Sequence, residues 1–218
     1  MSTKKIYLSP SDQYENRYFD GKHNEGEVCH TISGATEIAL KRSGVSVKRG
    51  KTGTYQQRAA ESNEWGADVH ICIHTNAGGG DGTLVMCHSG NKNEKIVKNI
   101  YNKIAAMSVG KDDGIKEVTN LYEINNTKAL CVYLEIGFHD NSKEGEWILE
   151  HEQEIGEAIA QAVCETYGYK YVSESSENVS RETLYRVQVG AFSEKANAEK
   201  LEAELKKKGY DTFIVKNS

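Results

Sequence analysis

Polar side chains that could hold a metal ion or move a proton follow three apolar segments of the sequence. His74 ends the run Asp-Val-His-Ile-Cys-Ile-His, Glu135 comes directly after Ala-Leu-Cys-Val-Tyr-Leu, and residues 9–13 follow Ile-Tyr-Leu. Glu25 opens a helical pattern, near enough in sequence to return to the same place. A histidine, a glutamate and one further N or O ligand, with an open fourth position, hold a catalytic zinc. A carboxylate that is not a ligand can then take a proton from water beside the metal.

Each of these residues also has an interpretation without a metal. His74 can be a histidine that is hydrogen-bonded at the end of a strand, and Glu25 can be a carboxylate that stabilises a helix N-terminus. Glu135 is harder to explain in this way. An acid that follows Cys-Val-Tyr-Leu enters the interior of a sheet, and burying it without a partner is costly. We therefore expect a metal, a base or a basic neighbour beside Glu135.

Alternating strands and helices must position these side chains. Apolar, β-branched segments predict strands, and apolar residues at helical spacing, often ended by glycine, predict helices. The expected strands are 4–8, 45–47, 68–74, 83–87 and 129–137, and the expected helices are 24–42, 54–65, 96–107 and 155–163. This order predicts an α/β fold with a mixed, mostly parallel sheet and helices on both faces. Chemistry in such a sheet gathers at the carboxyl ends of the strands.

The composition changes after residue 170. Residues 171–183 are polar, which indicates a linker. Residues 184–192 alternate as a strand does, residues 198–205 carry apolar positions at helical spacing before Lys-Lys-Lys, and 210–215 is a second short strand. We therefore predict a main domain at 1–170, a linker at 171–183 and a small C-terminal βαβ module at 184–218.

The bulk composition excludes several classes of protein. The net charge of −5 without a basic stripe argues against a nucleic-acid partner, and the short apolar runs argue against a membrane protein. The five cysteines are widely spaced and form no Cys-x-x-Cys motif, which favours reduced, mostly buried thiols. No signal-peptide core follows the first residues, so we expect synthesis in the cytoplasm without Sec export.

Residues 4–168 resemble the catalytic domain of the zinc N-acetylmuramoyl-L-alanine amidases, a family that includes phage endolysins and sporulation or autolytic amidases. Segment 67–77, Ala-Asp-Val-His-Ile-Cys-Ile-His-Thr-Asn-Ala, is similar to the family segment whose histidine binds zinc. The resemblance implies that His74 is a metal ligand, and Asn76 in the same segment is predicted to bind substrate. Segment 132–141, Val-Tyr-Leu-Glu-Ile-Gly-Phe-His-Asp-Asn, is similar to the family segment whose glutamate is catalytic, which implies that role for Glu135.

Two further matches support the resemblance. The family's ligand glutamate opens its first long helix and a glycine closes that helix, and Glu25 and Gly44 have the same separation. Arg58 and Asn63 match the arginine and asparagine that precede the histidine strand. The resemblance therefore implies that Glu25 is a metal ligand.

The sequence departs from the family at the first metal ligand. The family has Asp-Pro-Gly-His-Gly-Gly after its first strand, whereas this chain has Ser-Pro-Ser-Asp-Gln, so the expected histidine falls on Asp12. Aspartate is an acceptable zinc ligand, and we predict Asp12 in this role. Gln13 and His23 are the alternatives, and a zinc with two protein ligands and more water is another.

The remaining histidines of interest have simpler interpretations. We expect His70 and the neighbouring Cys72 to be core residues, although alternation places them on the face of His74. We expect His88, His139 and His151 to be exposed.

The resemblance implies a peptidoglycan hydrolase that cleaves the amide bond between N-acetylmuramic acid and L-alanine, with Zn²⁺ as cofactor and Glu135 as the group that moves the proton. The expected role is a phage or prophage endolysin that acts on the cell wall after its release and lyses the host. A bacterial autolytic or sporulation amidase and a metal-free wall-binding pseudoenzyme are the alternatives. Region 88–123, expected to be helix and loop, would line the groove for the stem peptide.

The C-terminal module resembles the first half of a SPOR domain, a small peptidoglycan-binding fold. Tyr-Arg-Val-Gln-Val-Gly-Ala-Phe at 185–192 and the later Asn-Ala at 197–198 carry this resemblance. That family has two βαβ halves, and a lone unit of this size buries little core and exposes strand edges. We therefore predict that residues 184–218 form a homodimer contact. Docking onto the main domain, disorder until the wall is met, and a generic βαβ unit without a ligand are the alternatives.

Overall fold

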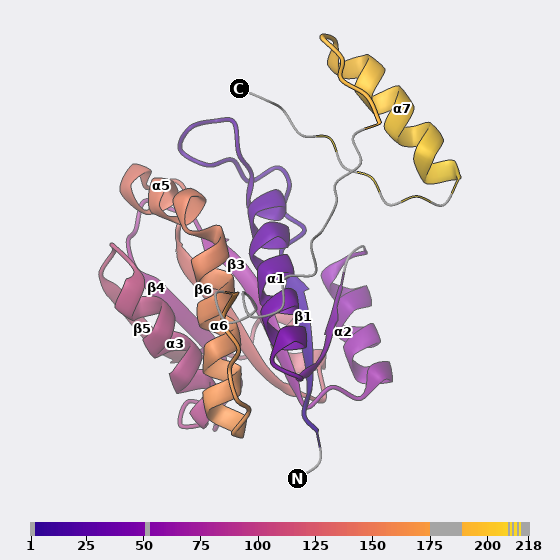
Figure 1. Cartoon of the computed structure of the whole chain (residues 1–218). Helices are drawn as coiled ribbons and strands as arrows, with labels where there is room; N and C mark the ends of the chain where they lie inside the picture. Colours follow the sequence, from indigo (N-terminus) through magenta and orange to yellow (C-terminus); the bar gives the residue numbers. More distant parts are fainter. Residues whose placement is uncertain are drawn as a thin grey trace. The chain divides into compact units, whose positions relative to one another are not determined.

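We analysed a computed structural model, which describes residues 3–50, 53–174 and 189–208 together with Tyr210, Thr212 and Ile214. The chain divides into two compact units, Met1–Glu177 and Asn178–Ser218 (Figure 1). The predicted linker at 171–183 runs into residues outside the described ranges. The predicted domain boundaries therefore stay predictions.

The first unit is built on a six-stranded sheet with the order β2-β1-β3-β6-β4-β5 (Figure 1). The strands are β1 (Lys5–Pro10), β2 (Ser46–Arg49), β3 (Val69–Asn76), β4 (Thr83–Cys87), β5 (Asp112–Glu117) and β6 (Leu130–Phe138). Strands β2, β1, β3 and β6 are parallel to one another, whereas β4 pairs antiparallel with β6 and parallel with β5. The expectation of a mixed, mostly parallel sheet is confirmed. Region 88–123, expected to be helix and loop, also contributes strand β5.

Helices cover both faces of this sheet, as predicted. Helices α1 (Glu25–Arg42), α3 (Lys95–Met107) and α6 (Glu152–Tyr167) pack together on one face (Figure 1). Helices α2 (Tyr55–Trp65) and α4 (Tyr122–Asn126) pack together, and α4 lies against β6 on the other face. Helix α5 (Ser142–Glu150) follows β6. The sequence analysis did not predict α4 or α5, because both are short and carry few apolar residues.

Local sequence explains where the two helices nearest the candidate site begin. The side chain of Asn24 accepts a hydrogen bond from the backbone N–H of Glu27 at 2.9 Å, which caps α1. Thr54 and Gln57 form a reciprocal capping box at the start of α2. Gly66 ends α2 with a φ of 68°, in the left-handed region that favours glycine. These caps determine where α1 and α2 begin and where α2 ends.

Alternation along the central strands gives the two faces of the sheet different chemistry. Ile71 and Leu134 belong to the main core beneath α1, α3 and α6. Cys72 and Cys131 lie on the opposite face, in a small cluster with Ile124 of α4. All five cysteines are buried and free, and the expected burial of the thiols is confirmed.

The second unit contains helix α7 (Lys195–Lys207), which ends with the cations Lys206 and Lys207. Cations there suit the negative end of the helix dipole. Of the strands predicted at 184–192 and 210–215, residues 184–188, 211, 213 and 215 lie outside the described residues. The described residues 189–192, Tyr210, Thr212 and Ile214 do not form a strand, so the prediction is wrong for them. Among the helices that the structure describes, none has the length and apolar character needed to cross a bilayer.

Candidate active site

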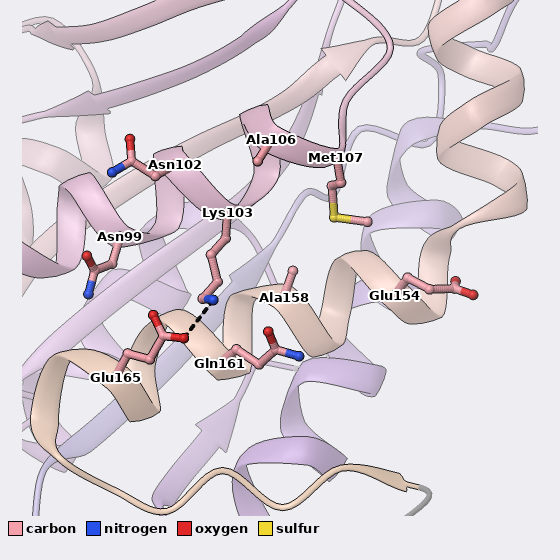
Figure 2. A pocket seen from close by; sticks show the side chains of 9 residues that line it. All are labelled: Asn99, Asn102, Lys103, Ala106, Met107, Glu154, Ala158, Gln161 and Glu165. Atoms are coloured by element: carbon pink, nitrogen blue, oxygen red, sulfur yellow. Dashed lines mark ion pairs between the residues drawn. The ribbon is translucent and has the colours of Figure 1, made fainter.

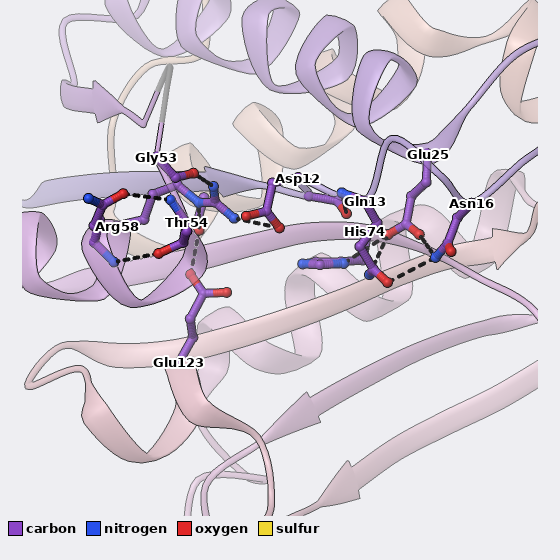
Figure 3. A network of polar contacts seen from close by, with 12 residues as sticks. Asp12, Gln13, Asn16, Glu25, Gly53, Thr54, Arg58, His74 and Glu123 are labelled. Carbon is purple, nitrogen blue, oxygen red and sulfur yellow. Dashed lines mark hydrogen bonds and ion pairs between the residues drawn. The ribbon is translucent and has the colours of Figure 1, made fainter.

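Three of the predicted site residues meet at one edge of the sheet. Strands β3 and β6 are neighbours in parallel register, and this register pairs His74 with Glu135. The start of α1 brings Glu25 to the same place, where its Oε1 lies 2.9 Å from Nδ1 of His74 (Figure 3). Glu25 is 1 % exposed and His74 is 5 % exposed. A buried carboxylate and a buried imidazole therefore face each other beside Glu135.

The carboxylate of Glu25 is held by several polar neighbours. Asn16 donates from Nδ2 to Oε2 at 2.8 Å, and Gln13 donates from Nε2 to Oε1 at 3.3 Å (Figure 3). Burial alone would raise the pKa of Glu25, but the hydrogen bond and charge of His74 and the hydrogen bond of Asn16 lower it further than burial raises it. Glu25 is therefore ionised at neutral pH and available as an anionic ligand.

The pKa values of His74 and Glu135 are both raised, but for different reasons. Burial lowers the pKa of His74, but its hydrogen bond to Glu25 and the charge of Glu135 outweigh burial and raise that pKa above its ordinary value. Burial raises the pKa of Glu135 to about 7, with His74 opposing this shift. A carboxyl group that titrates near neutral pH can both accept and return a proton, which is what a general base and acid must do.

The residues fit a zinc ion. Nε2 of His74 and Oε2 of Glu135 are both buried, and neither has a hydrogen-bond partner in the described structure. Oε1 of Glu25 and Nδ1 of His74 are 2.9 Å apart and share a hydrogen bond, so a zinc ion held by both atoms would take the place of the shared proton. An ionised carboxylate and an imidazole are ligands that zinc accepts.

The three candidates for a further ligand are placed differently. Asp12 points to Arg58, with 3.5 Å between Oδ1 and Nη2, rather than to the pair of Glu25 and His74 (Figure 3). His23 is exposed and bonds Asp20. Gln13 is the one candidate of the three with a recorded contact to Glu25. The assignment of Asp12 therefore stays a prediction, and it requires this carboxylate to leave Arg58.

A second polar network lies beside this site on the same face of the sheet. Arg58 is 2 % exposed and donates to Ser9 Oγ at 2.8 Å and to the carbonyl of Gly53 at 2.6 Å (Figure 3). Ser9 also bonds the carboxylate of Glu123, which lies 3.1 Å from Nε2 of His70. Sequence reasoning missed Glu123, because the short helix α4 that carries it gives no periodic signal.

Asn63 joins the elements around this network. Its Nδ2 donates to the carbonyl of Asn126 at 2.7 Å, and its Oδ1 accepts from the backbone N–H of Lys128 at 2.7 Å. The side chain thus connects α2 to the turn between α4 and β6. Asn63, which matches the family pattern, has a structural role in this arrangement.

One expectation about the other histidines is wrong. His139 is 2 % exposed rather than exposed, because it stacks on Tyr18 and bonds Thr75 Oγ1 at 3.0 Å. His88 is exposed, as expected, and His151 is partly buried at the end of α5.

Asn76 stands at the end of β3. Its side chain accepts from the backbone N–H of Ala77 at 2.9 Å, and its carbonyl accepts from the backbone N–H of His139 at 2.8 Å. These contacts shape the turn after β3. Its predicted role in binding substrate stays a prediction.

A separate hollow of about 580 Å³ lies between α3 and α6 (Figure 2). The ion pair between Lys103 and Glu165, at 2.7 Å, crosses it. Its lining comes from α3 and α6, on the face of the sheet opposite His74 and Glu135. The hollow is thus not part of the candidate active site.

Comparisons with known proteins agree with this architecture. The profile of the N-acetylmuramoyl-L-alanine amidase family matches residues 15–165, and the profile of the SPOR domain matches residues 164–218. One relative is the N-acetylmuramoyl-L-alanine amidase CwlM of Bacillus licheniformis, 28 % identical over 166 residues that cover 76 % of this chain and 63 % of the relative. Another is the sporulation-specific N-acetylmuramoyl-L-alanine amidase of Bacillus subtilis (strain 168), 26 % identical over 188 residues that cover 83 % and 71 %.

A solved structure shows the same fold. The catalytic domain of CwlV, an N-acetylmuramoyl-L-alanine amidase from Bacillus (Paenibacillus) polymyxa var. colistinus, superposes with a TM-score of 0.69 at 20 % identity, covering 77 % of this chain and 100 % of that domain. This chain spans less than two thirds of the length of the Bacillus licheniformis relative, at 63 %. The family profile nevertheless matches more than half of the present sequence. The chain therefore belongs to the N-acetylmuramoyl-L-alanine amidase family.

Proposed function

We propose that this chain is a zinc-dependent hydrolase that cleaves the amide bond between N-acetylmuramic acid and L-alanine in peptidoglycan. One observation carries the proposal. Glu25, His74 and Glu135 converge at one buried edge of the sheet, in a chain that belongs to this family. Two of these residues keep a buried polar atom without a protein partner in the described structure.

Each residue of the site has a task in this reaction. Glu25 and His74 would hold the metal, and Gln13 and Asn16 keep the carboxylate of Glu25 in place. A bound Zn²⁺ supplies Lewis-acid polarisation of the scissile carbonyl and lowers the pKa of water. Glu135 accepts a proton from the attacking water and returns it to the leaving alanine nitrogen. The pKa of about 7 suits Glu135 to both transfers.

Zinc content and wall lysis together test this proposal. We expect the purified chain to hold zinc at the amidase site and to lower the turbidity of a suspension of purified cell walls. Newly released alanine amino groups identify the bond that is cut. Wall binding without metal and without released amino groups would instead show a pseudoenzyme.

The rate should fall along an acid limb that lies at or below pH 7, because burial raises the pKa of Glu135 to about 7 in the metal-free chain. Glu135 must be ionised to accept a proton, and its pKa is raised to about 7, so acid removes the active form. His74 acts in the same direction because its pKa is also raised and a protonated imidazole cannot bind metal. The profile of kcat/KM against pH measures this limb. A bound divalent ion beside Glu135 displaces the limb towards lower pH, whereas a rate that stays flat down to pH ~4 is incompatible with this chemistry.

The biological role of the enzyme is a further part of the proposal. The name of the Bacillus subtilis relative, a sporulation-specific amidase, favours wall remodelling in a bacterium. The endolysin role predicted from the sequence, with synthesis in the cytoplasm and action after release, stays a prediction. Expression inside a host with and without a separate pore-forming protein tests it. Lysis that requires the pore former supports an endolysin, and no lysis in either case supports wall remodelling.

The C-terminal unit is the part of the chain that we propose to bind peptidoglycan and to join two copies. The SPOR profile matches residues 164–218, and α7 has no buried residue. Val189 and Tyr210, which precede and follow this helix in the sequence, are 61 % and 62 % exposed. Apolar side chains that a small unit cannot bury favour association with a second copy.

Light scattering on the whole chain measures this association. We expect a dimer at tens of micromolar, and a monomer for a shortened chain that ends at Tyr169. Sedimentation of both chains with purified walls measures peptidoglycan binding separately. A monomeric whole chain at this concentration would overturn the dimer.

A further inference from the structure

A second group of metal-binding side chains lies on the same face of the sheet as the candidate active site. His70, Cys72 and Cys131 each offer one ligand atom, and the three atoms lie within 4.8 Å of one another. All three residues are buried, with exposed fractions of 0 %, 0 % and 2 %. The cluster contains two sulfur atoms, whereas the predicted amidase residues offer only nitrogen and oxygen.

The pairing of β3 with β6 creates this cluster. His70 and Cys72 alternate on β3, and Cys131 is the register partner of His70 on β6. Sγ of Cys72 and Sγ of Cys131 are 3.8 Å apart. Two thiolates on a tetrahedral zinc, with Zn–S bonds of about 2.3 Å, span an edge of about 3.8 Å. The two sulfur atoms are therefore already spaced as zinc ligands.

The imidazole of His70 has one ring nitrogen hydrogen-bonded to a carboxylate and the other available to a metal ion. Its Nε2 lies 3.1 Å from Oε1 of Glu123, so this nitrogen carries the proton that the ionised carboxylate accepts. Its Nδ1 is buried and has no hydrogen-bond partner in the described structure. Histidines that bind zinc commonly donate the other ring N–H to a carboxylate, which fixes the tautomer and leaves a lone pair for the metal. Stacking on Tyr7, at 5.2 Å between ring centroids, fixes the ring plane.

The surrounding charges favour a divalent ion. The positive charge of Arg58 compensates the negative charge of Glu123. Ser9 connects the two, because its hydroxyl forms hydrogen bonds with both side chains. Two thiolates and a neutral imidazole carry a charge of −2, which Zn²⁺ cancels. A monovalent soft ion such as Cu⁺ would leave a net negative charge among apolar residues, which is costly. Thiolate and imidazole ligands together are typical of zinc.

We propose that His70, Cys72 and Cys131 bind a Zn²⁺ ion that joins β3 to β6 and is separate from the metal of the amidase site. Binding forms two Zn–S bonds and one Zn–N bond and releases the two thiol protons to solvent, without any change of oxidation state. The ion joins the two central strands close to Tyr133, whose ring stacks on His74 at 4.5 Å. Tyr133 packs against the cluster and stacks on His74, so it connects the proposed zinc site to the candidate active site.

X-ray absorption at the zinc edge of the whole purified chain tests this proposal. We expect sulfur scattering at about 2.3 Å, together with a second equivalent of zinc by elemental analysis. Sulfur scattering can come only from a cysteine site, because no cysteine is among the predicted amidase residues. The result is therefore independent of whether the chain hydrolyses peptidoglycan.

Substitutions assign the sulfur signal to this cluster. Cys131→Ala should abolish the sulfur scattering and remove one equivalent of zinc, whereas Cys164→Ala, at another buried thiol, should change neither. Glu123→Gln should weaken zinc binding at the cluster by about 10–100-fold, as expected for the partner of a ligating histidine. This variant keeps the thiols, so it tests the proposal even where Cys131→Ala fails to fold.

Two results would overturn the proposal. The first is zinc in the purified chain that is bound by nitrogen and oxygen alone. The second is a loss of two free thiols that a reductant restores, which would show a disulfide between Cys72 and Cys131 in place of the metal.

Discussion

The Glu135→Gln variant should lose nearly all hydrolysis of peptidoglycan while it keeps its fold and its zinc. Glutamine has the same shape as glutamate but cannot accept the proton of the attacking water. A positioned general base contributes about 10²–10⁴-fold to a rate, so we expect a loss within this range. Release of alanine amino groups from purified walls measures the rate, and elemental analysis measures the zinc.

The exposed Glu154 on α6 provides a matched control. It lies at the hollow between α3 and α6 (Figure 2), on the other face of the sheet from Glu135. Glu154→Gln removes the same charge from the chain and should leave the rate unchanged. If Glu135→Gln kept a tenth of the activity or more, Glu135 would not be the base.

The Glu135→Gln variant should also be more stable than the native chain at alkaline pH when both are metal-free. The pKa of Glu135 is raised to about 7 in the folded state, above the value of about 4.3 in an unfolded chain. Its protonated form therefore stabilises the fold at low pH, and this contribution is lost as the pH rises through about 7. The loss is of the order of 4 kcal/mol, at about 1.4 kcal/mol for each pH unit between the two pKa values. Thermal unfolding of both chains at acid and alkaline pH measures the difference.

Glu25→Ala and His74→Ala should each lose both metal and activity. Glu25 and His74 face each other at 2.9 Å and are both buried. Removing one of about three ligands weakens metal binding by orders of magnitude, because the ligands act together. Without zinc, the rate of wall hydrolysis should fall to the limit of detection. Zinc retained after dialysis, measured beside the rate, tests both statements.

Two controls separate metal binding from helix stabilisation. Glu27 is exposed in the first turn of α1, and Glu27→Ala removes a carboxylate from that turn at a cost of about 0.3–1 kcal/mol. This variant should keep its zinc and its activity. A Glu25→Ala chain that also kept both would assign Glu25 to the helix N-terminus alone. His74→Ala has a second effect, because it leaves Glu25 buried without its main partner, and thermal unfolding shows how far the fold is weakened.

Much of the fold could be predicted from the sequence, because its long elements carry periodic apolar patterns. Segments 68–74 and 129–137 are rich in apolar and β-branched residues, and they form β3 and β6 at the centre of the sheet. Helix α1 has a regular apolar face, so its predicted start at residue 24 lies within one residue of the observed start at Glu25. Strand β5 and helix α4 were not predictable, because packing rather than local pattern determines them.

The sequence by itself determined which residue types stand at the ends of the central strands. His74 and Glu135 follow β-branched runs in parallel strands, and parallel strands bring their carboxyl ends to one edge. The convergence of these residues with Glu25 follows from that rule. The ordered motifs around them also identified the amidase family.

Only the tertiary structure decided how the remaining polar residues are partnered. Asp12 is paired with Arg58 because α2 presents a buried cation to the loop after β1. His70 and Cys131 are 61 positions apart in the sequence but adjacent in the sheet, where the register of β3 and β6 pairs them. Alternation within one strand can be read locally, but the pairing of two distant strands depends on the packing of the whole sheet. The sulfur cluster therefore has no sequence signature, whereas the amidase residues do.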